Sequence, residues 1–107
     1  MQARFLRLAL AVGTFSLILP TVVRADSAQI YKTNCVVCHS ANGSSESAAG
    51  KLLKAKDLRT PEVQKQTDAA LTEIINKGKG KMPAFGAKIN PDDMKALIAY
   101  LRELAKK

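Results

Sequence analysis

The chain has one histidine, two cysteines and no tryptophan, and aromatic residues make up only 5% of its 107 positions. A single histidine excludes a metal site that needs two or three histidine ligands. Two cysteines exclude a Cys₄ zinc or iron–sulfur site and a network of several disulfides. No segment alternates polar and apolar residues for long enough to predict a β-strand. The few chemically special residues therefore carry most of the functional information.

The N-terminal residues have the pattern of a secretory signal. Two arginines among the first seven residues form a basic start, residues 8–19 are an apolar run, and Val23-Arg24-Ala25 is a small-residue cleavage signature. We expect a cleaved signal peptide over residues 1–25 and a single domain over residues 26–107. The alternative is an uncleaved anchor, although a spanning helix needs about 20 apolar residues.

The expected domain is short enough that its apolar core alone is marginal. Domains of this size commonly depend on a disulfide, a metal or another staple. The pattern Cys35-Val36-Val37-Cys38-His39 supplies one, because C-x-x-C-H is typical of c-type haem attachment. Two thiols separated by two residues on a helical turn reach the two vinyl groups on one side of a porphyrin. His39 is then carried under the ring, where its imidazole can bind the iron.

Other interpretations of the two cysteines are a thioredoxin-like redox pair, a lone disulfide and half of a zinc site. A thioredoxin-like pair belongs with a βαβ pattern, which this sequence does not have. A zinc site would lack its other ligands. The adjacent histidine and the preceding export signal favour haem attachment at Cys35 and Cys38.

The sixth position of a haem iron needs a second ligand, and a second histidine is excluded within one chain. Met82 lies in a Gly- and Pro-rich stretch, residues 78–86, that predicts an irregular loop. Such a loop can bring a thioether to the iron, and His/Met ligation is the electron-transfer arrangement. Met94 falls in a helical pattern, where core packing is the expected role. We predict His39 and Met82 as the axial iron ligands.

Two alternatives to Met82 stay open. A lysine of the same loop, Lys79 or Lys81, is within reach of the same position. The sixth position could also be open, which would make the protein a haem enzyme or a gas sensor.

Taken together, these motifs resemble those of the small monohaem class I c-type cytochromes. Cys35, Cys38 and His39, followed by Met82-Pro83, match the attachment and ligand motifs of that family over essentially the whole expected domain. The chain is similar to the short soluble bacterial cytochromes and to the algal and cyanobacterial carriers that replace plastocyanin. The resemblance implies an all-α, compact class I cytochrome c fold, with about four short helices around one covalently attached haem c.

The resemblance also implies a contact between the first and last helices. Ser27 stands where the family usually has glycine at this crossing. Many members have a proline whose carbonyl accepts the N–H of the axial histidine, but no proline lies between His39 and Arg59. The acceptor for His39 is therefore left undetermined, although it tunes the basicity of the ligand. The residues expected at the crossing are Tyr31, Leu97 and Tyr100.

Helix signals divide the rest of the chain. The expected segments are a helix capped by Asp26 and Ser27 that runs into Cys38, a loop over 40–49, a helix begun by Thr60-Pro61-Glu62, a helix capped by Asp68 and ended by Gly78, and a last helix opened by Asn90-Pro91. The apolar stripe of the last helix is Met94, Leu97, Ile98, Leu101 and Leu104. The residues expected to bury the haem are Tyr31, Leu52, Leu58, Leu71, Ile75, Phe85, Leu97 and Leu101.

Basic residues exceed acidic ones, giving a formal net charge of +8. Part of this excess brackets Met82, which the resemblance places near an exposed haem edge. A ring of lysines there would steer acidic protein partners, although a merely solvated surface is the plain alternative. Lysines further upstream could pair with haem propionates. The ring consists of Lys77, Lys79, Lys81 and Lys88, and the upstream lysines are Lys51, Lys54 and Lys56.

These features predict a periplasmic one-electron carrier that shuttles electrons between protein redox partners. A thylakoid lumen is the corresponding location in a photosynthetic organism. We expect a monomer with no membrane span after signal cleavage, no nucleic-acid binding and no enzymatic activity, because no acid–base pair or substrate pocket is apparent. The alternative is a haem subunit bound to one particular dehydrogenase or reductase.

Overall fold

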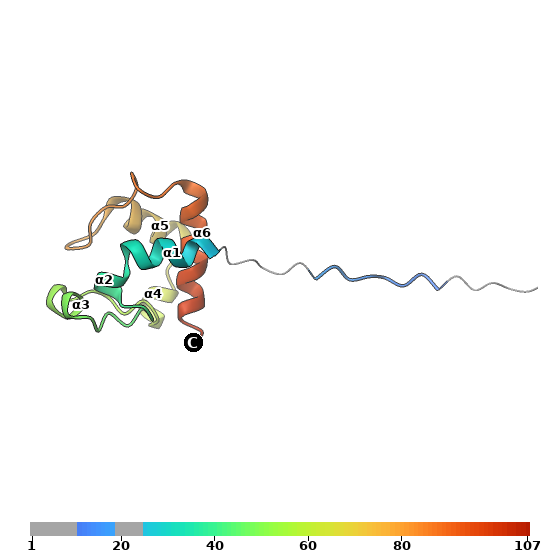
Figure 1. The fold of residues 1–107 in the computed structure, drawn as a ribbon, viewed down its shortest axis with the longest axis horizontal. Coiled ribbons are helices and arrows are strands. Elements are labelled where there is room, and N and C mark those ends of the chain that lie inside the picture. Colours follow the sequence, from blue (N-terminus) through green and yellow to red (C-terminus); the bar gives the residue numbers. More distant parts are fainter. Residues whose placement is uncertain (1–10, 19–24) are drawn as a thin grey trace, which may run out of the picture.

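The computed structural model describes residues 11–18 and 25–107. Residues 11–18 form no helix or strand and are exposed, away from the folded body (Figure 1). The basic start and most of the cleavage signature of the expected signal peptide lie outside the described residues.

The described part of the chain is helical, and its only β-type pairing is one isolated bridge between Lys79 and Met82. This confirms the all-α prediction. Instead of about four helices there are six helical segments, because three short turns of helix separate the longer ones. They are α1 (Ala25–Asn34), α2 (Val36–His39), α3 (Ala48–Leu53), α4 (Pro61–Gln64), α5 (Asp68–Lys77) and α6 (Pro91–Leu104).

The predicted first helix is interrupted at Cys35, so that α1 and α2 are separate. The backbone hydrogen bonds are nearly continuous through this break, since Cys35 N–H donates to the Tyr31 carbonyl and His39 N–H donates to the Cys35 carbonyl. The helix also begins earlier than predicted, at Ala25. Asp26 and Ser27 therefore lie in its first turn, and their prediction as capping residues is wrong.

Side-chain caps fix the starts of α5 and α6. The side chain of Asn90 accepts a hydrogen bond from Asp93 N–H at the start of α6, as predicted. At α5 the cap is Thr67, which accepts from Ala70 N–H, rather than Asp68. Because the backbone of Thr67 is extended, its side chain can reach the Ala70 N–H, which has no partner within the helix. Asp68 becomes the first residue of the helix.

The core lies where α1 crosses α6 (Figure 1). Tyr31 and Leu97 are almost completely buried there, and the Tyr31 and Tyr100 rings are tilted against each other with centroids 5.2 Å apart. The crossing predicted from the family resemblance is confirmed, with Ser27 fully buried in it. All five residues of the predicted stripe of α6 are buried.

No helix among residues 11–18 and 25–107 has the length and apolar character needed to cross a bilayer.

Candidate functional site

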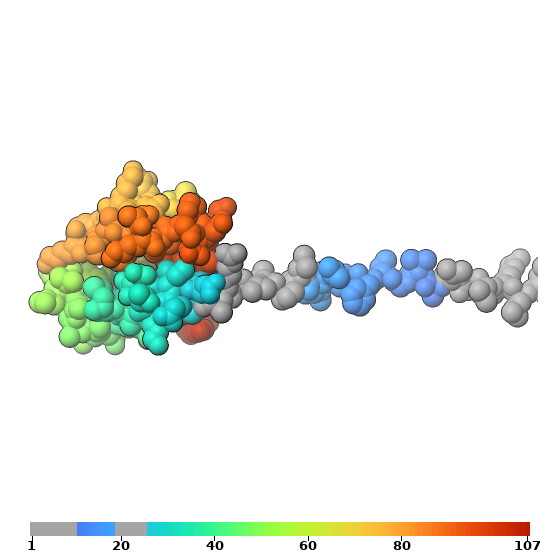
Figure 2. Space-filling model, turned by 45° about the horizontal axis from the view of Figure 1, so that its top comes forward, coloured from blue at the N-terminus to red at the C-terminus, as the bar shows by residue number. Residues whose placement is uncertain are grey.

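A cavity of about 640 Å³ opens between the two halves of the domain. One wall comes from α1, α2 and the segment after α3, and the other comes from α5, the loop after it and α6. In the space-filling view, the teal and green N-terminal segments and the orange loop lie against each other (Figure 2). The cavity volume is within the range of about 300–1,000 Å³ that holds cofactor-sized ligands.

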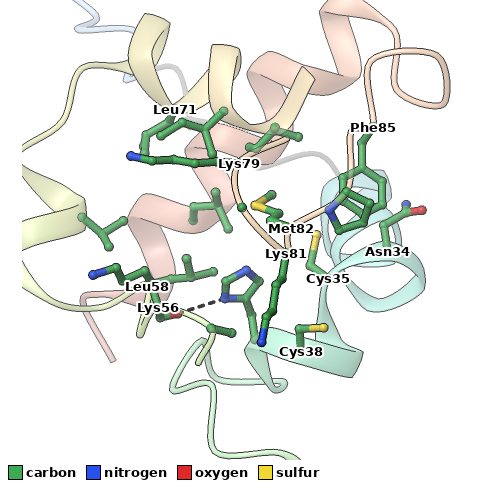
Figure 3. A pocket seen from close by; sticks show the side chains of 18 of the residues that line it. Asn34, Cys35, Cys38, Lys56, Leu58, Leu71, Lys79, Lys81, Met82 and Phe85 are labelled. Atoms are coloured by element: carbon green, nitrogen blue, oxygen red, sulfur yellow. Dashed lines mark hydrogen bonds between the residues drawn. The ribbon is translucent and has the colours of Figure 1, made fainter. Parts of the chain in front are cut away.

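The cavity brings together all four residues predicted from the sequence to hold a haem. Cys35, Cys38 and His39 line it from the first wall, and Met82 lines it from the second. Figure 3 shows the side chains of Cys35 and Met82 around the same space, although they come from elements far apart in the sequence. The sequence spacing alone could not show that Met82 faces the C-x-x-C-H segment.

The two cysteines are half-buried and are not joined by a disulfide. Burial and, to a smaller extent, the neighbouring Cys38 thiol together raise the pKa of Cys35 to about 11. A reactive redox pair or a zinc site needs the opposite shift, toward the thiolate. Among the described residues there is also no group of three or more His, Cys, Asp or Glu side chains that could hold a metal, which argues against the zinc interpretation.

The imidazole of His39 is oriented by two oxygen atoms. Its Nδ1 lies 2.9 Å from the Lys56 carbonyl oxygen, the contact that is dashed in Figure 3, and 3.1 Å from Ser45 Oγ. Because a carbonyl only accepts hydrogen bonds, Nδ1 carries the proton, which leaves the Nε2 lone pair for a metal. Burial lowers the pKa of His39, against a smaller opposite effect of the Lys56 hydrogen bond, so the ring favours its neutral form.

The backbone that carries the C-x-x-C-H segment is clamped by its neighbours. Tyr31 Oη donates to the Ser40 carbonyl at 2.6 Å, and burial raises the pKa of Tyr31, which keeps this hydroxyl protonated. Ser47 Oγ donates to the Val37 carbonyl and also accepts from Gly50 N–H, at the start of α3. A Cβ at Gly50 would overlap the backbone of Cys38, so only glycine fits there.

Met82 lies in a tight turn rather than in an open irregular loop. Lys79 N–H donates to the Met82 carbonyl at 3.1 Å, and Met82 N–H donates back to the Lys79 carbonyl at 3.0 Å. Two glycines with positive φ, Gly78 and Gly80, allow the chain to turn so sharply. Met94, by contrast, is buried in the core and does not line the cavity, as predicted.

The apolar walls agree with most of the prediction. The prediction that Leu52 buries the haem is wrong, because this residue is 78% exposed. The next residue of α3, Leu53, lines the cavity instead. Successive residues point in different directions on a helix, so a shift of one position changes the face. Tyr31 is buried at the α1–α6 crossing rather than in the cavity wall. The predicted residues that do line the cavity are Leu58, Leu71, Ile75, Phe85, Leu97 and Leu101.

Several lysines border the cavity. Three of the four predicted around Met82 line it, whereas Lys77 is paired with Glu73 at 2.9 Å on the exposed side of α5. Of the three upstream lysines, Lys51 does not line the cavity. The lysines that do line it are Lys54, Lys56, Lys79, Lys81 and Lys88.

The residues present fit a haem. The cavity has the size of a cofactor pocket, an apolar lining, two thiols, a neutral imidazole with a free Nε2 and a thioether from the opposite wall. Sequence reasoning missed Ser45, the Lys56 carbonyl and Gly50, which support this arrangement. Ser45 belongs to a stretch whose composition only predicts a loop, Gly50 follows directly after that stretch, and a backbone carbonyl has no sequence signal.

Comparisons with known proteins agree with this fit. The family model of cytochrome c oxidase, cbb3-type, subunit III matches residues 24–101. Cytochrome c6 of Microcystis aeruginosa is 35% identical over 82 residues, which are 77% of this chain and 98% of that protein. Cytochrome c6 of Gloeothece citriformis is 32% identical over 94% of this chain and 90% of its own length. The solved structure of KustC0563 c-type cytochrome superimposes with a TM-score of 0.67 and 30% identity, covering 73% of this chain and 95% of that one.

Proposed function

Because the chain belongs to the small monohaem class I c-type cytochromes, which makes it a haem-c electron carrier, we propose that it shuttles single electrons in the periplasm. Its one haem is covalently bound, and in our proposal the thioether bonds are made by Cys35 and Cys38. His39 and Met82 are the proposed axial ligands. The observation that carries this assignment is that one apolar cavity collects all four side chains.

When bound, a haem with histidine and methionine ligands supplies a one-electron couple between ferric and ferrous iron. The chain's residues hold and tune that group. His39 presents a neutral Nε2 because its Nδ1 proton is held by the Lys56 carbonyl. The turn around Met82 presents the thioether from the opposite wall. Apolar residues on both walls would cover the faces of the bound group and limit the access of water to it.

The ligand assignment is tested with the two methionines of the domain. Met82→Leu removes the thioether, whereas Met94→Leu makes the same chemical change in the core and serves as its control. We expect the Met82 variant to lose the sulfur-to-iron charge-transfer band of the ferric protein and to bind carbon monoxide when reduced. The Met94 variant keeps the band. A wild-type protein that lacks the band or binds carbon monoxide readily would contradict Met82 ligation.

The proposed location rests on the N-terminal residues, and the proposed partners rest on lysines that line the cavity. A signal peptide over residues 1–25 would bring the domain to the periplasm, and the exposure of residues 11–18 is consistent with a leader outside the domain. The proposed partners are redox proteins with acidic docking surfaces, which meet Lys79, Lys81 and Lys88 at the cavity mouth. Enzymatic activity is not part of the proposal.

The docking surface is tested by exchanging three lysines for glutamine in two sets of equal charge. One set is Lys79, Lys81 and Lys88, and the control set is Lys32, Lys65 and Lys95, which are exposed but do not line the cavity. With ferricyanide as an anionic oxidant at low salt, we expect the first set to slow oxidation about tenfold. The control set changes it much less. Equal rates for the two sets would contradict the docking surface, because net charge alone would then explain the slower oxidation.

A second candidate function is a haem subunit bound within a redox complex. The matching family model describes subunit III of a cbb3-type oxidase, which favours this alternative. The cytochrome c6 of Microcystis aeruginosa, matched over nearly its whole length, favours a free carrier. Purification of the matured protein from its native membrane and periplasmic fractions separates the two, since a bound subunit elutes with a larger assembly.

A further inference from the structure

Ser45 joins the two groups that orient His39. Its Oγ lies 3.1 Å from His39 Nδ1, and its hydroxyl donates a hydrogen bond to the Lys56 carbonyl oxygen. The same carbonyl oxygen lies 2.9 Å from His39 Nδ1. Ser45 is only 6% exposed, so its hydroxyl lies away from bulk water. The three groups make a closed hydrogen-bonded ring.

The Lys56 carbonyl lies in an irregular segment between Ala55 and Leu58, whose N–H groups donate to the Gly50 and Gly43 carbonyls. Residues 55–57 belong to no helix or strand. The Lys56 side chain is exposed and pairs with Glu62 at 3.2 Å, so it does not anchor the backbone in the interior. A proline would restrict φ at this position, but a lysine leaves it free.

The backbone of Ser45 is also bound to His39. Its backbone N–H donates to the His39 carbonyl at 2.9 Å. Its φ is +61°, a left-handed conformation in which glycine or asparagine is favoured over serine. The chain therefore places a strained serine where its backbone is held by His39 and its hydroxyl holds the acceptor of the His39 side chain.

We propose that Ser45 is a positioning residue for the axial histidine: its hydroxyl holds the Lys56 carbonyl against His39 Nδ1 and so sets the electron donation of the imidazole. A well-placed acceptor on Nδ1–H makes the imidazole more basic and stabilises the ferric state. Without the hydroxyl, the Lys56 peptide turns toward water and the acceptor weakens. This inference rests on the proposed function, which makes His39 an axial ligand.

Two substitutions separate the hydroxyl from the backbone. Ser45→Ala removes the hydroxyl and keeps the strain of a left-handed residue. Ser45→Gly removes the hydroxyl and relieves the strain, so it also protects against a failure to fold. Ser44→Ala is the control, because the only hydrogen bond shown for Ser44 is from its backbone N–H to Asn42 Oδ1.

The measurements are the reduction potential of the matured protein and the exchange rate of the His39 Nδ1 proton, followed by NMR in the reduced state. We expect both Ser45 variants to have a higher potential than the wild type, by similar amounts. Exchange of the Nδ1 proton should be about tenfold faster, the loss expected for one hydrogen bond. Ser44→Ala should match the wild type in both measurements.

Different results identify which idea fails. Wild-type potential and exchange in both Ser45 variants would overturn the role of the hydroxyl. A shift in Ser45→Ala but not in Ser45→Gly would overturn it too, because strain would then be the cause. Absence of an iron-bound imidazole signal in the wild type would overturn the proposed ligation itself, and the inference with it.

Discussion

The two walls of the cavity are built in contrasting ways. The wall with Cys35, Cys38 and His39 is a packed block, in which side chains from α1 and the loop before α3 bond to the backbone of α2 and the residue after it. The wall with Met82 is a turn that leaves α5 and returns to it. It is held by the Lys79–Met82 pairing and by the bond from Phe85 N–H to the Ile75 carbonyl.

This difference assigns separate tasks to the two walls. A covalently attached group and its histidine need one fixed geometry, and a backbone held from several sides supplies it. A turn fixed mainly at its ends can open by local unfolding at lower cost than the packed block. We therefore expect substitutions in the first wall to reduce haem attachment and stability. Substitutions in the second wall should disturb the binding of Met82 to the iron.

The largest expected effect is at Gly50, in the packed wall. A Cβ there would overlap the carbonyl oxygens of Cys38 and Ser45, which are backbone atoms without room to move. We expect Gly50→Ala to cost at least about 3 kcal/mol, a large share of the stability of a small domain. Yield of the haem-containing protein and its thermal midpoint measure this. A yield and midpoint equal to those of the wild type would show that α2 and α3 are not closely packed.

Gly78 gives the corresponding test in the turn. Its φ of +74° and ψ of 168° fall in a region essentially limited to glycine, and a Cβ would lie 2.6 Å from the Met82 carbonyl oxygen. We expect Gly78→Ala to cost about 1–3 kcal/mol and to displace Met82, seen as loss of the charge-transfer band with haem still attached. Gly80→Ala is the comparison that isolates the overlap, because the φ of Gly80 is also positive, at +58°, but nothing lies within 4 Å of its Cβ. If both variants keep the band, the turn does not depend on Gly78.

The wall with Cys35, Cys38 and His39 was easier to predict from the sequence than the turn with Met82. C-x-x-C-H is a local motif whose spacing is dictated by chemistry, so Cys35, Cys38 and His39 could be named from the chain alone. The stripe of α6 was equally readable, because a helical period repeats over its whole length. Met82 could be named as a candidate, but its tight turn could not, since the pairing with Lys79 depends on backbone geometry.

The error at Leu52 arises because a short helix has no period to average over. Leu52 was expected to be buried, but α3 has only six residues and its register places Leu53 at the cavity. Lys77 pairs with Glu73 one helical turn away and does not line the cavity, and its part in docking stays a prediction. The acceptor of His39 was undetermined because it is a backbone carbonyl of an irregular segment.

A smaller effect is expected from the hydroxyl of Tyr31. Tyr31→Phe removes the 2.6 Å hydrogen bond to the Ser40 carbonyl but leaves the ring packed against Tyr100. We expect a loss of about 1 kcal/mol in the free energy of unfolding. Tyr100→Phe is the matched control, because its hydroxyl makes no hydrogen bond among the described residues. Equal stability of the two variants in denaturant titrations would mean that this bond does not help to hold the packed wall.

The smallest expected effect is a pH dependence that differs between the two walls. Three donors of Arg59, its backbone N–H, Nε and Nη2, reach the Asp57 carboxylate beside the segment of Lys56, and the Arg59 side chain holds the pKa of Asp57 below its ordinary 3.8. On α5, Lys77 lowers the pKa of Glu73 through one Nζ contact. A lowered folded pKa stabilises the protein above the unfolded pKa, and this contribution is lost as the pH falls through the folded value. We therefore expect Asp57→Asn to flatten the acid side of the thermal midpoint curve, below about pH 4, more than Glu73→Gln does. Arg59 makes three contacts with Asp57, whereas Lys77 makes one with Glu73. A larger flattening in Glu73→Gln than in Asp57→Asn would therefore show that the contacts between Arg59 and Asp57 do not persist in solution.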